Sequence, residues 1–327
     1  MPSEQRKLKR AAARLRRLLS KQKRDDFIQA VKLELRQHRP SFVVYVILSA
    51  LTIFTLVRSI LNGSYENTFL CILTLALLLI PSIMQVRFHV EIPITLEVTL
   101  LIFIFAGEVL GEIEQFYTIF PYWDTLLHTI NGFLAAAIGF SFAIVLNRDE
   151  HVAFRMSPFF LSLVAFSFSM TVGVLWEFVE FFGDQLTGAD MQKDTIIQSI
   201  SSIVMNPDGI QKPIAINDIH STVVNGEDLG IDGYLDIGLY DTMEDLFVNF
   251  IGALTFSIIG NLAIRGGENE QRITNSLMLS KKRTSDDYLK QIEARDSELK
   301  ELRNRILDLE MQQAELEKRS KRRKGRG

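Results

Sequence analysis

The sequence predicts an all-α protein: a six-helix transmembrane bundle with an extracytoplasmic loop and cytoplasmic helical tails. Three observations predict this fold. Six apolar runs recur along the 327 residues, and most are long enough to cross a hydrocarbon core, which takes about 20 residues. Charge is divided between the middle and the ends of the chain. Lys and Arg fall in alternate connecting loops. The runs occupy residues 41–61, 67–84, 94–111, 123–146, 158–182 and 242–264.

Composition divides the chain into three regions. Residues 1–40 hold 13 Lys or Arg against 4 Asp or Glu, residues 41–264 hold 6 against 23, and residues 265–327 hold 17 against 12. We predict a basic cytoplasmic N-terminal helix (1–40), a six-span membrane domain (41–264, with an outer loop at 184–240) and a cytoplasmic coiled-coil tail with a basic end (265–327). Cys71 is the only cysteine, which excludes an intramolecular disulfide.

The first region is expected to be a helix over 5–37, with leucines that share one face among Lys and Arg. Such a helix either lies on an anionic lipid leaflet, where each basic residue contributes about 1 kcal/mol, or stays solvated in the cytoplasm. Pro40 separates it from the first span. The leucines are Leu8, Leu15, Leu18 and Leu19.

Loop charges predict the orientation of the spans. With the N-terminus inside, every short loop obeys the rule that Lys and Arg stay on the cytoplasmic side. We therefore predict a multi-pass protein of the bacterial plasma membrane with both termini cytoplasmic. Pro81 is expected to kink or shorten the second helix. The cytoplasmic loops are 85–93, which contains Arg87, and 147–157, which contains Arg148 and Arg155. The outer loops are 62–66 and 112–122, which contain no Lys or Arg, and 184–240, which contains Lys193 and Lys212.

The outer loop 184–240 alternates Asp, Asn and Gly with short β-prone pieces. This pattern predicts small hairpins rather than an independently packed domain. The acidic residues of the loop form either a solvated surface or, in D-L-G-I-D-G-Y-L-D at 228–236, a calcium loop that lacks the full EF-hand pattern.

The tail carries apolar residues at heptad spacing. This predicts a coiled coil and a homo-oligomer formed through 285–317, and the alternative is a single amphipathic helix that packs on another part of the chain. The basic run 318–326 favours anionic lipid over nucleic acid as a partner, because a membrane is near. One heptad position holds Ile292, Leu299 and Ile306, and the other holds Leu302, Leu309 and Leu316.

The stretch W-E-F-V-E-F-F-G-D places three acidic residues at the outer end of the fifth span. Spacings of three and four put Glu177, Glu180 and Asp184 on one helix face. A helix C-terminus carries partial negative charge, so three carboxylates there need protons, basic side chains or a bound cation. We expect this group to be part of a polar site.

Other polar residues lie at the outer ends of neighbouring spans. Asp124 and Asp241 stand at helix starts, where each is either a cap for backbone N–H groups or part of the site. Capping does not explain residues one or two turns further in, and Gly252 lets another helix approach closely. Glu97 alone lies toward the cytoplasmic side, where it snorkels or favours a helix N-terminus. The inner residues are His128, Asp245 and Asn249.

This residue set is suited to a divalent cation or to shared protons. Carboxylate oxygens bind Mg²⁺, Mn²⁺ or Ca²⁺, and a histidine nitrogen favours Mn, Fe or Zn. Without a metal, crowded carboxylates share protons and serve acid–base work or proton-coupled transport. Whether the protein is an enzyme stays open, because no nucleophile motif, phosphate-binding loop or dinucleotide fingerprint occurs. The predicted metal ligands are Asp124, His128, Glu177 and Asp245.

Three motifs resemble those of the VanZ-like and YjdF-like small bacterial membrane proteins. They are W-D-T-L-L-H-T-I-N-G, W-E-F-V-E-F and Y-D-T-M-E-D-L-F-V-N-F-I-G-A-L, in this order between residues 95 and 265. The VanZ-like proteins are associated with glycopeptide resistance and the cell envelope. The resemblance implies a cell-envelope role. The matching positions are Asp124, His128, Glu177, Asp241, Asp245 and Asn249.

Three functions are consistent with these observations. The first is recognition or modification of an anionic envelope lipid or headgroup through a metal held by the outward-facing site. The second is cation- or proton-coupled transport through the same residues. The third is a membrane scaffold that works through its coiled-coil tail.

Overall fold

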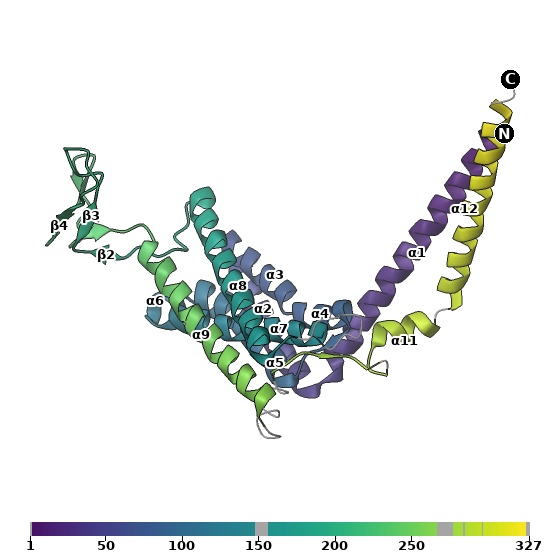
Figure 1. Cartoon of the computed structure of the whole chain (residues 1–327), viewed down its shortest axis with the longest axis horizontal. Helices are drawn as coiled ribbons and strands as arrows, with labels where there is room; N and C mark the ends of the chain where they lie inside the picture. Colours follow the sequence, from purple (N-terminus) through teal and green to yellow (C-terminus); the bar gives the residue numbers. More distant parts are fainter. Residues whose placement is uncertain (1, 148–155, 267–276, 284, 296, 325–327) are drawn as a thin grey trace. The chain divides into compact units, whose positions relative to one another are not determined.

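The computed structural model describes residues 2–147, 156–266, 277–283, 285–295 and 297–324 (Figure 1). It is mainly helical, and six of its helical segments are long and apolar enough to cross a membrane, which confirms the predicted all-α, six-span fold. The chain divides into two compact units, residues 1–109 with 279–327 and residues 110–278. The six apolar helical segments are Arg39–Leu61, Tyr65–Phe88, Ile94–Ile113, Trp123–Asn147, Pro158–Thr187 and Leu239–Arg265.

The first unit contains the first two apolar segments and most of the third. The second segment divides just before Pro81, as predicted, because Pro81 has no N–H to continue the helix. The third ends in a π-helical stretch, η1. The elements are α1 (Pro2–Gln37), α2 (Arg39–Leu61), α3 (Tyr65–Leu77), α4 (Ile80–Phe88), β1 (Val90–Glu91), α5 (Ile94–Phe105), η1 (Ala106–Ile113), β8 (Ser280–Lys281), α11 (Tyr288–Arg295) and α12 (Ser297–Lys324).

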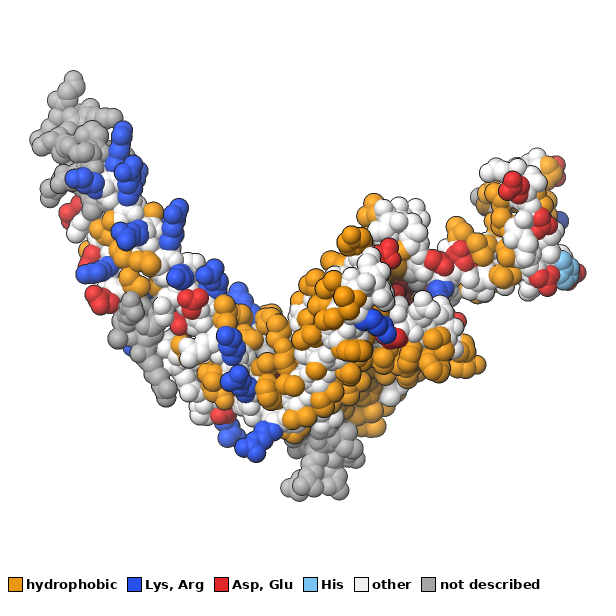
Figure 2. All heavy atoms as spheres, turned by 180° about the vertical axis from the view of Figure 1, so that it is seen from behind, with side chains coloured by type: hydrophobic (Ala, Val, Ile, Leu, Met, Phe, Trp, Pro, Cys, Tyr) orange, Lys and Arg blue, Asp and Glu red, His pale blue; other side chains and the backbone are white. Residues whose placement is uncertain are grey.

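The two terminal helices of this unit lie side by side (Figure 1). Ile306 of α12 is buried, and Glu310 forms an ion pair with Arg16 of α1. Figure 2 shows Lys and Arg side chains spread along their outer surface. Within one chain α12 therefore packs on α1, and the coiled-coil oligomer stays a prediction. The side chains of Leu8, Leu299, Leu316 and 318–326, and loop residues 148–155, lie outside the described parts.

The second unit is built on α7 (Trp123–Asn147), α8 (Pro158–Thr187) and α9 (Leu239–Arg265), which pack together, and the short helix α6 (Phe116–Ile119) contacts α7. A Cβ on Gly132 would lie 2.1 Å from the Asn249 carbonyl oxygen, and one on Gly252 would lie 2.1 Å from the Thr129 carbonyl oxygen. These glycines let α7 and α9 approach closely, which confirms the prediction for Gly252. The buried core consists of Ala136, Ala137, Phe140, Ala143, Leu161, Ala165, Ala253 and Phe256.

Between α8 and α9 the outer loop forms antiparallel pairs of two or three residues per strand. This confirms the prediction of small hairpins. The pairs are β2 (Ile196–Ile197) with β7 (Tyr234–Leu235), β3 (Ile200–Ser202) with β4 (Ile214–Ile216), and β5 (Val223–Val224) with β6 (Glu227–Asp228).

The outward surfaces of the apolar helices carry large hydrophobic side chains, which are visible in Figure 2. Phe54 of α2 is 70% exposed, and Phe178 of α8 is 53% exposed. Soluble proteins rarely expose contiguous apolar surface on this scale, whereas a lipid environment requires it. Together with the six apolar segments, this surface indicates a multi-pass membrane protein.

Candidate functional site

The predicted site residues of the second unit come from one end of the three packed helices. Because α8 runs antiparallel to both of its neighbours, the starts of α7 and α9 lie beside the C-terminal turns of α8. The first two turns of α7 carry Asp124 and His128. The first three turns of α9 carry Asp241, Asp245 and Asn249, and the last three turns of α8 carry Glu177, Glu180 and Asp184.

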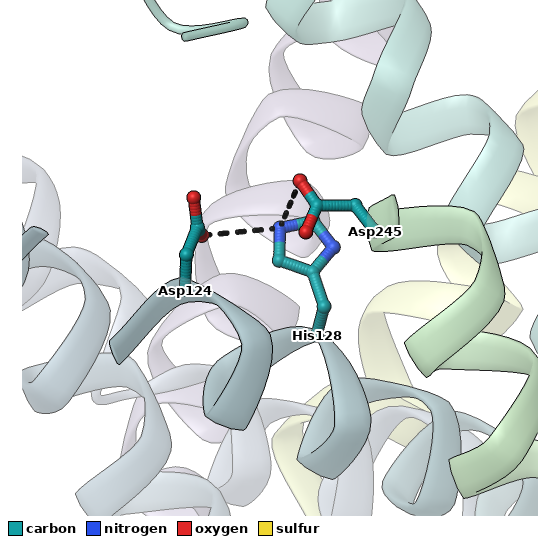
Figure 3. A group of neighbouring side chains, drawn as sticks. All are labelled: Asp124, His128 and Asp245. Carbon is teal, nitrogen blue, oxygen red and sulfur yellow. Dashed lines mark ion pairs between the residues drawn. The ribbon is translucent and has the colours of Figure 1, made fainter. Parts of the chain in front are cut away.

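His128 lies between two aspartates from different helices. Its Nε2 atom is 3.5 Å from Asp124 Oδ1 and 3.5 Å from Asp245 Oδ2, and Asp245 reaches it from α9 (Figure 3). His128 is 7% exposed and Asp245 is 3% exposed. These separations are longer than a good hydrogen bond, and the contacts are ion pairs only when the imidazole is protonated. One potential ligand atom from each of the three side chains lies within 4.8 Å of the other two.

A second group of three shares Asp245. Ligand atoms of Glu177, Glu180 and Asp245 also lie within 4.8 Å of one another, and all three side chains are buried. Trp176 Nε1 donates to Glu180 Oε1 at 2.8 Å. Both oxygens of Glu177, Glu180 Oε2 and Asp245 Oδ2 are buried and have no hydrogen-bond partner among the described residues. Burying a carboxylate without a partner costs several kcal/mol, so this group calls for protons or a cation.

Lys193 of the outer loop is a site residue that the sequence analysis did not assign. Its ammonium forms an ion pair with Asp124 and lies 4.5 Å from the centre of the Tyr117 ring. Burial lowers the pKa of Lys193, but the hydrogen bond and charge of Asp124, with the charges of Asp241 and Asp245, outweigh it and raise that pKa above its usual value. The sequence signal was present, because Lys193 and Lys212 are the only basic residues of an acidic outer loop.

Comparison with known families bears on the same segment of the chain. Residues 43–266 match the model of the family described as "predicted membrane protein (DUF2238)". The chain belongs to this family. The match covers the first apolar segment from residue 43, the other five in full and every predicted site residue, and it excludes all of α1 and all of α12. No curated protein and no solved structure matches the chain.

In this DUF2238 protein, Asp184 and Asp241 hold the loop rather than join either group of three. Asp184 Oδ1 accepts from the Met191 amide at 2.6 Å and its Oδ2 from the Gln192 amide at 2.9 Å. Asp241 Oδ2 accepts from the Lys193 amide at 3.0 Å. Asp241 therefore does not cap α9 through its side chain, and Asp236 instead accepts from the Tyr240 amide at 2.7 Å. These contacts fasten residues 191–193 beside the acidic side chains.

Asn249 lies one turn deeper than Asp245 and belongs to the packing between helices. Its Oδ1 accepts from Asn131 at 3.4 Å, its Nδ2 donates to the Ser169 carbonyl at 3.5 Å, and Ser169 donates to the Gly132 carbonyl at 2.7 Å. Beyond this polar layer the three helices meet through the apolar core around Phe140 and Phe256, whose rings are 5.9 Å apart. The described part of this unit thus places an apolar layer directly below the site.

The three aspartates of the suggested calcium loop engage separate partners. Asp228 Oδ1 accepts from the Gly230 amide at 2.7 Å, Asp232 Oδ1 lies 2.7 Å from His220 Nδ1, and Asp236 binds the start of α9. Among the described residues they do not form a group of converging ligands. The geometry favours the solvated-surface alternative for this loop.

Proposed function

We propose that the protein binds a divalent cation through Asp124, His128, Asp245 and Glu177 and uses it to recognise or modify an anionic headgroup of an envelope lipid. The observation that carries this proposal is the set of buried carboxylate oxygens without hydrogen-bond partners. A hard cation offsets such a cluster, and a histidine beside carboxylates favours Mn²⁺ or Zn²⁺ over Ca²⁺.

The depth of the site supports a lipid headgroup as its target. A helix of 30 residues such as α8 is about 45 Å long, whereas the hydrocarbon core is about 30 Å thick. The turns that carry Glu180 and Asp184 therefore reach the headgroup level. Trp176 and Phe178, on the same turns, have exposed side chains suited to the membrane interface. A cation held there meets lipid phosphates, and the similarity to VanZ-like and YjdF-like motifs supports an envelope role.

The charges of the loops support the proposed orientation, with both termini in the cytoplasm of a bacterial cell. In that orientation the site opens outward. Arg58, in the last turn of α2, is an exception on the outer side, and its long side chain suits the interface. The first test is labelling of single cysteines placed at the exposed Asn62 and Ser221, in a background in which Cys71 is replaced, with an impermeant reagent. Labelling from the inside alone would overturn the orientation.

Transport has less support than headgroup binding. A transport path needs polar groups on both sides of the site. Among the described residues, an apolar core follows Asn249 on the side away from the outer loop, so the polar groups do not continue there. Flux in proteoliposomes that depends on Asp245 would overturn this preference. The scaffold alternative predicts that deleting residues 285–327 abolishes the cellular phenotype of the protein.

The cation is tested by titrating the detergent-solubilised, chelator-treated protein with Mn²⁺ and Zn²⁺. We expect Asp124→Asn and His128→Ala to weaken binding by roughly 10- to 100-fold or more, because each removes a ligand. Glu244→Gln is the matched control, because Glu244 is an exposed carboxylate beside Asp245 and belongs to neither group of three. A wild type that binds neither metal, or a control that weakens binding equally, overturns the proposal.

The headgroup is tested separately in nanodiscs that contain phosphatidylglycerol or phosphatidylcholine. We expect the metal-loaded wild type to retain the anionic lipid preferentially, and we expect chelator or His128→Ala to abolish that preference. A preference that persists without metal would place lipid recognition elsewhere, for example on the basic terminal helices.

A further inference from the structure

We propose that the site holds two divalent cations, with Asp245 shared between them. The first cation is bound by Asp124, His128 and Asp245, and the second by Glu177, Glu180 and Asp245. This inference rests on the proposed function, which requires only one cation, and it goes further by giving separate ligand sets to two cations.

Each group of three has the dimensions of one coordination sphere. Opposite ligands of a cation bound at 2.0–2.1 Å lie about 4.2 Å apart, and those of Ca²⁺ lie about 5 Å apart. The ligand atoms in each group are all within 4.8 Å of one another. Small side-chain adjustments are therefore enough to close either group around an ion. Asp245 alone belongs to both groups, and its carboxylate has two oxygens to share.

The second group has its own evidence, independent of the acidic cluster. Glu177, Glu180 and Asp245 are 5%, 7% and 3% exposed. Glu180 and Asp245 each present a buried oxygen without a hydrogen-bond partner among the described residues, and the two donors that face Glu177, those of Thr242 and Gln192, form no hydrogen bond of normal geometry with it. Trp176 occupies only Glu180 Oε1, which leaves Oε2 as the free ligand atom and fixes the orientation of the carboxylate, as outer-shell donors do around bound metals.

Charge balance favours two cations over one. Among the described residues the carboxylates of the site face one Lys or Arg side chain, that of Lys193. One divalent cation would leave most of the remaining negative charge uncompensated in a largely buried site, and a second cation offsets most of what is left. Uncompensated buried charge costs several kcal/mol per ion. The carboxylates are those of Glu112, Asp124, Glu177, Glu180, Asp241 and Asp245.

Two cations joined by a carboxylate define a class of ligand. Paired ions about 3.5–4 Å apart bind phosphate oxygens from both sides, which is the arrangement that two-metal sites use for phosphate esters. Phosphate is also the shared feature of anionic lipid headgroups. The second cation therefore narrows the proposed ligand to a phosphate monoester or diester, whose oxygens bridge both ions.

Stoichiometry tests this inference. We expect the solubilised wild type to bind two Mn²⁺ per chain, measured by elemental analysis and calorimetry, and to give the spin-coupled electron paramagnetic resonance signal of a close Mn²⁺ pair. Glu180→Gln and His128→Ala should each retain one Mn²⁺ and lose the coupled signal. The control Glu244→Gln should retain both.

The outcomes separate this inference from the proposed function. One Mn²⁺ in wild type that Glu180→Gln leaves unchanged and His128→Ala removes overturns the second cation and keeps the first. Two Mn²⁺ in Glu180→Gln also overturn it, because the second ion then lies elsewhere. No Mn²⁺ in wild type overturns both proposals. Glu→Gln changes preserve side-chain volume, and the coupled signal is read on wild type, so a misfolded variant does not decide the test.

Discussion

Both units of the molecule bury ionisable side chains, but the first pairs them more fully: Glu34, Glu97 and Asp287 each have at least one hydrogen-bond or ion-pair partner. Glu34 and Lys282, from opposite ends of the chain, form an ion pair in which the side chains are 0% and 1% exposed. Gln85 donates to Glu97 Oε1 at 3.3 Å. Asp287 has His89 Nδ1 at 2.8 Å and Lys290 Nζ at 3.1 Å. In the second unit Glu177 is 5% exposed and has no ion pair among the described residues. The side chains of Thr242 and Gln192 face its carboxylate, but neither forms a hydrogen bond of normal geometry with it.

The pKa shifts of two acids in the first unit, outside the membrane spans, show how partners act against the effect of burial. Burial raises the pKa of Glu34, and the hydrogen bond and charge of Lys282 act against that rise. For Asp287, burial also acts to raise the pKa, but the Lys290 contacts and His89 outweigh it and lower the pKa below its usual value. A buried acid is therefore not a functional marker by itself. A buried acid that has no ion pair or hydrogen bond of normal geometry among the described residues is a stronger indication of a binding site.

The largest predicted effect concerns the buried pair of the first unit. Lys282→Met leaves Glu34 as an uncompensated buried charge, and we expect a loss of about 3–5 kcal/mol of local stability. The Lys282 amide donates to the His89 carbonyl, so its hydrogen exchange reports the opening of this region.

The double variant Glu34→Leu with Lys282→Met is the control for that prediction. Replacing both partners of a buried pair by apolar residues is often neutral, so most of the lost stability should return. Equal losses in the single and double variants would mean that packing, rather than charge pairing, holds this region together.

The second prediction applies one substitution to both units. Glu34→Gln should lower stability by about 1–3 kcal/mol, because Lys282 loses its charged partner. Glu177→Gln should raise the melting temperature of the metal-free protein, because it removes a negative charge that has no partner. Melting curves in chelator measure both. A lower melting temperature for metal-free Glu177→Gln would remove the contrast between the units.

The sequence predicted the helical part of this arrangement well. The apolar runs predicted the six segments. Pro81 interrupts its helix and Gly252 allows close packing of two helices, as the sequence predicted. Helix spacing and the alternating direction of the spans together predicted that Asp124, His128, Glu177 and Asp245 lie at one end of the helices, and the structure brings them into two groups that share Asp245.

The sequence patterns did not predict contacts between distant segments of the chain. Lys193 contacts Asp124 because Asp184 and Asp241 hold the loop backbone in place. Helix or strand periodicity in the sequence does not predict such a long-range contact. Glu97 illustrates the same limit. It lies in the first turn of α5, as the helix-start alternative predicts, but it is buried and accepts from Gln85 rather than snorkelling. Local spacing selects residues that share a face, whereas tertiary contacts decide which of them have partners.

The third prediction tests whether Lys193 acts as a built-in competitor for the first cation. Its ammonium already pairs with Asp124, so a metal must displace it from that carboxylate. Lys193→Met should therefore tighten Mn²⁺ binding by about three- to tenfold, which corresponds to about 1 kcal/mol. Lys212→Met, on the same loop, is the control and should leave the affinity unchanged. Weaker binding in Lys193→Met would show that the lysine supports the site.

The smallest predicted effect concerns a pair with the same chemistry as the site but without its burial. His220 Nδ1 lies 2.7 Å from Asp232 Oδ1, closer than His128 lies to either aspartate, yet these side chains are 70% and 79% exposed. Water solvates both groups, and exposed pairs contribute little. His220→Ala should therefore leave Mn²⁺ stoichiometry and the melting temperature unchanged, measured beside His128→Ala. If His220→Ala removed a bound ion, the loop would hold the metal, and burial without a partner would no longer distinguish the two regions.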